Sequence, residues 1–176
     1  PSTGPARDAG KVAGLIAVVV AAILSLSYAV WAFTARRGIF SDFADGNPVS
    51  TNDAKSSDTI DTVLLVVAGL VVVIALVLWV ILMTNRKTSG GAFDLGGLAA
   101  SGVGVVVVLV GLLLASGISD GNGRAEQGDK GVTASLVVGG GFLLLAIGLL
   151  VGVFAVRGSR EISRNGFSPR SSYQSW

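Results

Sequence analysis

The sequence contains no cysteine and no histidine among its 176 residues. The lack of cysteine excludes disulfide bonds, thiolate metal sites and cysteine nucleophiles in this chain. The lack of histidine removes the commonest metal ligand and the usual general base near neutral pH. Charged residues are also scarce, at 14%, whereas an ordinary soluble domain has about 25%. Chemistry that depends on these side chains is therefore not expected.

The few charges are unevenly distributed, and four stretches contain no Asp, Glu, Lys or Arg: residues 12–35, 62–85, 95–119 and 131–156. Each is long enough for a helix to cross a hydrocarbon core, which takes about 20 residues. The first is longer than the apolar region of a signal peptide, about 7–15 residues, so we expect it to be retained. The fold class we predict is all-α: an integral membrane four-helix bundle.

Three parts follow from this pattern. Residues 1–10 form a polar leader, residues 11–156 the membrane domain and residues 157–176 a basic tail. The expected spans are about 12–35, 60–84, 95–118 and 132–156. Ser50 followed by Asp53 has the spacing of a capping box, so the second helix is expected to begin before Ile60.

Lys and Arg near the span ends predict the orientation, because cytoplasmic loops are richer in them. Eight lie in the N-terminal segment, the 86–94 loop and the tail, and five lie in the loops 36–61 and 120–130. Both termini are therefore expected in the cytoplasm. Three arginines of the tail share one helical face and are expected to contact lipid headgroups or an acidic partner: Arg157, Arg160 and Arg164.

Aromatic residues lie near the ends of the first two spans. Tyr28 and Trp31 precede the first outer loop, and Trp79 precedes the inner loop. Amphipathic rings are favoured at these depths, so we expect an interfacial belt. In the first outer loop Phe40 and Phe43 have helical spacing, which predicts a short amphipathic turn on the membrane surface.

Small residues form faces on three of the four spans. Such faces allow helices to approach closely in lipid, where hydrophobicity does not drive association. The third span also offers the pairs Gly97/Ser101 and Ala100/Gly104. The residues for which we predict a helix-packing role are Ala13, Ala17, Ala21 and Ser25 in the first span, Gly111 and Ala115 in the third, and Gly141, Gly148 and Gly152 in the fourth.

The second span is different, because it is mostly bulky and β-branched, and we expect it to face lipid more than its neighbours. The helix that enters the glycine groove of the fourth span can belong to this chain or to another. The sequence leaves both alternatives open.

Residues 27–87 resemble the opening hairpin of an uncharacterised family of actinobacterial multi-spanning membrane proteins. In that family a span ends near Trp and Arg, an acidic Ala- and Asp-rich loop follows, and the next span ends in Trp and an Asn/Arg pair. The matching residues here are Trp31, Arg36, Asp45, Asp53, Ala54, Asp58, Trp79, Asn85 and Arg86. The resemblance implies a bacterial plasma membrane and no established activity.

The sequence offers little for catalysis or transport. No ionisable residue lies inside a span, where transporters usually keep one. The acidic loops lack the spacing of an EF-hand. We expect no enzyme activity, cofactor, metal, nucleic acid or small-molecule substrate. The function we predict is an accessory or scaffolding subunit of a membrane complex, respiratory or transport-related, that binds the lipid bilayer and other integral membrane chains. The alternative is a small self-assembling channel or transporter.

Overall fold

The computed structural model describes the backbone of residues 5–84 and 92–164, and the side chains of residues 12–81, 83–84 and 95–153. Throughout these ranges the chain is helical apart from short connections. Its elements are α1 (Pro5–Trp31), η1 (Ala32–Arg36), α2 (Arg37–Ala44), α3 (Thr51–Thr84), α4 (Ala92–Ser116), η2 (Ile118–Asp120) and α5 (Arg124–Arg164). Four helical segments are long and apolar enough to cross a membrane. The predicted all-α membrane four-helix bundle is confirmed.

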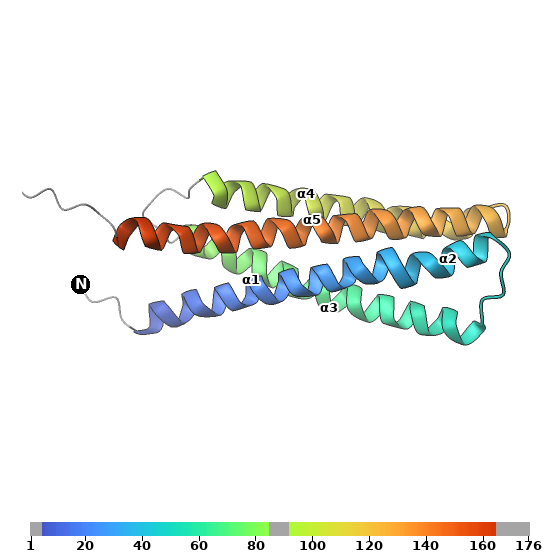
Figure 1. Ribbon diagram of the computed structural model, residues 1–176, viewed down its shortest axis with the longest axis horizontal. Coiled ribbons are helices and arrows are strands. Elements are labelled where there is room, and N and C mark those ends of the chain that lie inside the picture. Colours follow the sequence, from blue (N-terminus) through green and yellow to red (C-terminus); the bar gives the residue numbers. More distant parts are fainter. Residues whose placement is uncertain (1–4, 85–91, 165–176) are drawn as a thin grey trace, which may run out of the picture.

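The four long helices alternate in direction along one axis (Figure 1). Residues 45–50 and 117–123 connect helices at one end of the bundle, which we call the loop end. The first turn of α1 and the last turn of α5 lie at the opposite end. α4 packs along α5, α5 packs along α1 and α2, and α1 packs along α3. α1 and α5 are therefore the central pair, with α4 and α3 outside them.

The helices are longer than the spans that the sequence predicts. α5 has 41 residues, which is about 60 Å at about 1.5 Å per residue, whereas a hydrocarbon core is about 30 Å thick. α3 begins at Thr51, where Ser50 acts as its cap: the Asp53 N–H donates to Ser50 Oγ at 3.1 Å, and Ser50 Oγ donates to Asp53 Oδ2 at 2.7 Å. The early start of this helix is therefore as the capping box predicts.

The first outer loop is much shorter than the sequence indicates, because η1 and α2 continue α1 to Ala44. The expected surface turn is wrong. Phe40 lies against Gly131 and Ala44 lies against Gly128, so α2 packs on the first turns of α5. The glycines explain this, because the absence of side chains at both positions lets α2 approach the α5 backbone.

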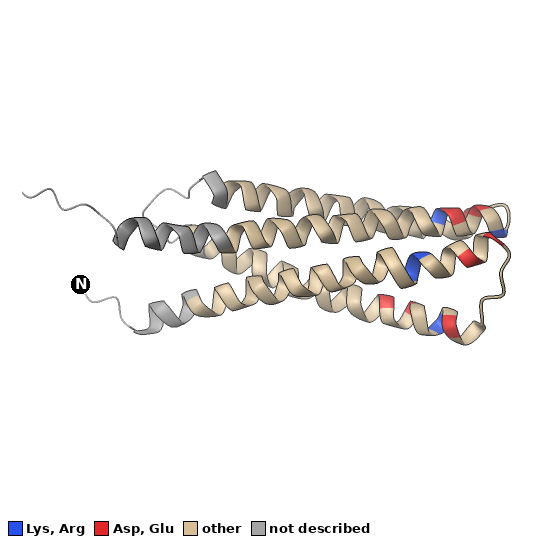
Figure 2. Ribbon diagram, in the orientation of Figure 1, with Lys and Arg blue, Asp and Glu red and all other residues tan. Residues whose placement is uncertain are grey.

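Charged side chains gather at the loop end in the part of the chain whose side chains are described (Figure 2). They lie on η1, α2, the first turns of α3 and α5, and the α4–α5 connection. The interior between them and the opposite end is mostly apolar, with Phe142 and Leu149 among its largest buried side chains and the buried serines Ser25 and Ser101 among its polar members. This distribution is the one that a bilayer requires of a spanning bundle.

Candidate helix-packing site

A close helix contact joins α4 to α5 through glycines of both helices. A Cβ atom built on Gly141 would lie 2.7 Å from the Val108 backbone nitrogen, and one on Gly148 would lie 2.7 Å from the Ser101 nitrogen. Real Cβ atoms essentially never approach other atoms within 3.0 Å. The two backbones therefore touch, and only glycine fits at these positions. The glycine groove of α5 receives a helix of the same chain.

α4 contributes its own glycines to this contact. A Cβ on Gly104 would lie 2.8 Å from the Leu145 nitrogen, and one on Gly111 would lie 2.7 Å from the Val138 nitrogen. Small residues thus alternate between the two helices along their shared length. Ala115, near the end of α4, is half-buried. The predicted residue Gly111 is not alone in this contact, because α5 also lies against Gly97, Ser101 and Gly104 of α4.

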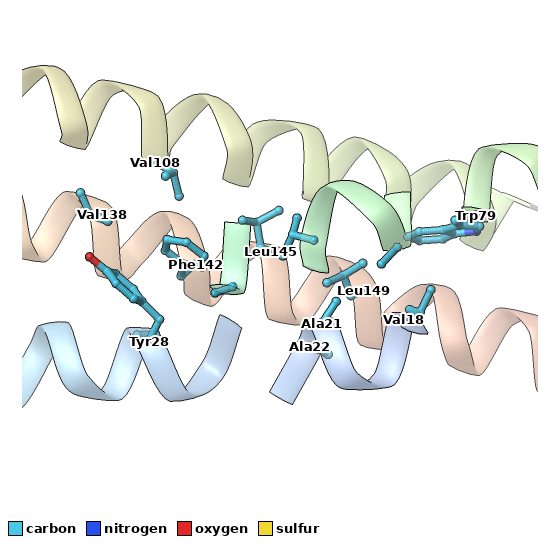
Figure 3. Packing of buried hydrophobic residues seen from close by; sticks show 14 of the residues in the cluster. Val18, Ala21, Ala22, Tyr28, Trp79, Val108, Val138, Phe142, Leu145 and Leu149 are labelled. Atoms are coloured by element: carbon cyan, nitrogen blue, oxygen red, sulfur yellow. The ribbon is translucent and has the colours of Figure 1, made fainter. Parts of the chain in front are cut away.

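Gly152 has a different neighbour, the indole ring of Trp79 on α3. The ring also lies 2.8 Å from the position of a Cβ on Gly97, so it fills a slot between α4 and α5. Trp79 is 4% exposed (Figure 3). The ring therefore faces neighbouring helices and not lipid, and its interfacial depth stays a prediction. This wedge joins α3 to the α4–α5 pair.

Tyr28 is also buried within the bundle. Its ring centroid lies 4.3 Å from that of Phe142 on α5, with the planes tilted by 39° (Figure 3). Its hydroxyl donates to Asp61 Oδ1 at 2.9 Å. The phenol therefore has the apolar packing and the polar partner that a buried tyrosine needs, and the ring points into the bundle and not toward lipid.

The small-residue stripe on α1 is buried along only part of its length. Ala21 and Ser25 are fully buried, Ala17 is half-buried and Ala13 is exposed. Four residues turn an α-helix by about 40° more than a full turn, so a row at every fourth position winds around the helix. The buried face instead follows a mixture of three- and four-residue steps: Val18, Ala21, Ala22, Ser25, Tyr28, Ala29 and Ala32.

Two contacts were missed from the sequence, although signals for one of them exist. Gly128 and Gly131 are three residues apart on α5, and Phe40 and Ala44 are four apart on α2, so each pair lies on one helical face. The other contact is the polar pairing of α1 with α3. The side chains of Arg157, Arg160 and Arg164 lie outside the described residues.

A shallow groove of about 440 Å³ opens between the end of α4 and the start of α5. Its polar part includes a Glu126–Lys130 ion pair, with a distance of 2.9 Å between Glu126 Oε1 and Lys130 Nζ. Among the described residues, no group of three or more acidic side chains is arranged to hold a metal ion. The groove is lined by Leu113, Leu114, Gly117, Asp120, Glu126, Asp129, Lys130 and Thr133.

The geometry is therefore that of a helix-packing site, built from glycine and small residues in three helices. Comparison with protein families, with curated proteins and with solved structures finds no match to this chain.

Proposed function

We propose that this chain is an accessory or scaffolding subunit of a membrane complex, and that it binds helices of other integral membrane chains through faces that its own bundle leaves open. The host we propose is a respiratory or transport assembly of a bacterial plasma membrane, with both termini of the chain in the cytoplasm. The lipid bilayer covers the remaining apolar surface.

The observation that carries this proposal is a contrast between two faces of α4. The inward face, with Gly97, Ser101 and Gly104, is filled by α5. The outward face has Ala99 and Gly102, both exposed, and nothing lies within 4 Å of a Cβ built on Gly102. At Ala99 and Gly102 a second helix can approach the outward face closely, because neither residue has a bulky side chain.

The interior of the bundle supports a structural role. Where α4 meets α5 the backbones touch, and where α1 meets α5 the space is filled by side chains such as Phe142 and Leu149 (Figure 3). A permeating ion needs either charged groups or a ring of polar atoms to replace its water. The spans carry no charged residue, so the bundle offers a better surface for contact than a path for transport.

The test is purification of the tagged full chain from native membranes in mild detergent, with quantitative mass spectrometry of the proteins that accompany it. We expect one stoichiometric set of membrane proteins with the native chain. Ala99→Leu and Gly102→Leu should reduce that set at least about tenfold, because a bulky side chain holds two backbones apart.

Val73→Leu is the matched control, because Val73 is 59% exposed on α3 and the change adds bulk to a different lipid-facing surface. It should leave the accompanying proteins unchanged. Purification of the native chain as a solitary monomer would overturn the proposal. Equal retention of the same proteins by all three variants would show that they do not bind the outward face of α4.

A further inference from the structure

A cluster of five polar side chains joins α1 and η1 to α3 near the loop end. Arg36 is its centre: its Nη1 lies 2.6 Å from Asp58 Oδ1 and donates to Ser57 Oγ at 3.2 Å, and its Nε lies 3.8 Å from Asp61 Oδ2. Tyr28 completes the cluster through its hydrogen bond to Asp61. We call these five residues the polar cluster.

The polar cluster lies where two charge-free stretches end. Arg36 is the first charged residue after the stretch 12–35, and Asp61 is the last before the stretch 62–85. The side chains of Arg36 and Asp61 are 17% and 22% exposed. Charge pairs that are largely removed from water interact more strongly than fully exposed ones. The cluster therefore provides a specific attachment between two helices that otherwise meet through small apolar side chains.

Arg36 is the last residue of the π-turn η1 and pairs with α3. A π-turn closes its hydrogen bonds over five residues rather than four, so the residues after it are rotated relative to those before it. Arg36 pairs with Asp58 of α3 and also lies over the Phe40 ring, 4.7 Å from its centroid, while Phe40 packs on Gly131 of α5. The continuous helix of α1, η1 and α2 contacts α5 on both sides of the π-turn, through Tyr28 and through Phe40, and it contacts α3 through α1 and η1.

α3 is the least enclosed helix at the loop end. Between Thr51 and Val67 only Ser57 is fully buried, while Ile60, Val63 and Val66 are exposed. Its other buried side chains, Ala68, Val72, Ala75 and Trp79, lie farther along the helix. α2 and the start of α3 separate from each other toward the loop end (Figure 1). The polar cluster is thus the attachment of residues 51–67 that lies nearest the loop end, and the half-buried Leu64 and Leu65 pack on the core beyond it.

We propose that residues 51–67 of α3 form a hinged strap, for which the polar cluster is the latch and Ala68, the first of the buried apolar side chains, is the pivot. With the latch closed, α3 covers the hydroxyl of Tyr28 and the neighbouring face of α1. With the latch open, this half of α3 tilts away while α1, α2, α4 and α5 stay packed. The inference does not depend on any partner and stands apart from the proposed function.

The absence of cysteine makes the strap directly measurable, because introduced cysteines are the only sites for spin labels. One pair, Asn52→Cys with Asn122→Cys, reports the start of α3 against the start of α5, and all of these positions are exposed. A second pair, Asp45→Cys with Asn122→Cys, reports α2 against α5. Distances are measured by double electron–electron resonance on the full chain in lipid vesicles.

The variants that open the latch are Asp61→Asn and Arg36→Gln. From Ala68 to Asn52 the lever is about 24 Å long, so a tilt of about 10° moves the reporting label by about 4 Å. In both variants we expect the Asn52–Asn122 distance to increase, or its distribution to broaden, by about this amount. The Asp45–Asn122 distance should be unchanged. Lys130→Gln is the matched control, because it breaks an ion pair at the same end that lies outside the cluster.

Three results would overturn the strap. One is an Asn52–Asn122 distance in Asp61→Asn that equals that of the parent chain. Another is an equal change in both label pairs, which would show that the cluster holds the whole loop end rather than one segment. The third is a shift in Lys130→Gln as large as the shift in Asp61→Asn.

Discussion

The α4–α5 pair and the α1–α3 pair are both antiparallel helix contacts in one bundle, but different groups hold them together. α4 and α5 touch backbone to backbone over most of their shared length, through glycines such as Gly104, Gly141 and Gly148. α3 meets α1 through small side chains in the middle of the helix and is fixed at two places, by the Trp79 wedge and by the polar cluster.

This difference separates two kinds of dependence on sequence. A contact between two backbones leaves no space for a side chain, because any side chain introduced there forces the helices apart. A contact made by a few side chains can lose one of them and keep the rest. Substitutions between α4 and α5 should therefore disrupt the whole bundle, and substitutions between α1 and α3 should have graded effects.

The largest effect is expected at Gly141, and the adjacent Gly140 provides the control. In Gly141→Leu the new side chain would collide with the Val108 backbone, so the free energy of unfolding should fall by more than about 3 kcal/mol, the upper range of overpacking in a core. Nothing lies within 4 Å of a Cβ on Gly140, so Gly140→Leu should stay within about 0.5 kcal/mol of the parent chain.

The measurement for both variants is unfolding of the full chain in mixed micelles titrated with a denaturing detergent, followed by circular dichroism. Equal loss of stability in the two variants would mean that glycine matters here for backbone conformation and not for contact with α4.

A smaller loss is expected when the wedge of α3 is removed. Trp79→Ala leaves an empty slot against Gly97 and Gly152. The cost should be about 2 kcal/mol, less than the roughly 3–5 kcal/mol of a soluble core, because lipid can cover the exposed surface without the penalty that water imposes.

The same micelle titration measures this cost, and Trp79→Phe is the control that keeps an aromatic ring in the slot. We expect Trp79→Phe to recover at least half of the loss. A Trp79→Ala chain as stable as its parent would show that α3 does not depend on the wedge.

The sequence was sufficient to predict the helical architecture, because a chain that crosses a bilayer has few possible structures. Stretches without charge, each more than 20 residues long, cross it as helices whatever their neighbours are. The glycine face of the fourth span could also be found, since Gly141 and Gly148 are seven residues apart and lie on one side of a helix. The partner of that face could not, because the spacing in one helix does not say which helix fills it.

The direction in which a side chain points was harder to predict from the sequence than its position along a helix. Tyr28 and Trp79 lie near span ends, but position along a helix does not determine whether a ring points to lipid or to another helix. The row of small residues on α1 leaves the helix interface at Ala13, because a spacing of four residues does not match the period of an α-helix. The π-turn at Ala32–Arg36 and the polar cluster depend on how α1 and α3 are offset along the axis, and one sequence does not contain that offset.

The smallest effect is expected for the hydroxyl of Tyr28, and it separates the two roles of this side chain. Tyr28→Phe keeps the ring against Phe142 and removes only the donor to Asp61, whose carboxylate stays near Arg36. Hydrogen bonds between membrane helices are worth about 0.6 kcal/mol on average, so stability in the micelle titration should fall by about that amount. Tyr28→Leu removes the ring stacking as well and should cost about 1–2 kcal/mol, since an aromatic pair contributes about 0.5–1.5 kcal/mol beyond its area. If Tyr28→Phe is as damaging as Tyr28→Leu, the hydrogen bond rather than the stacking holds α1 at this point, and the attachment of α3 is more polar than its buried area indicates.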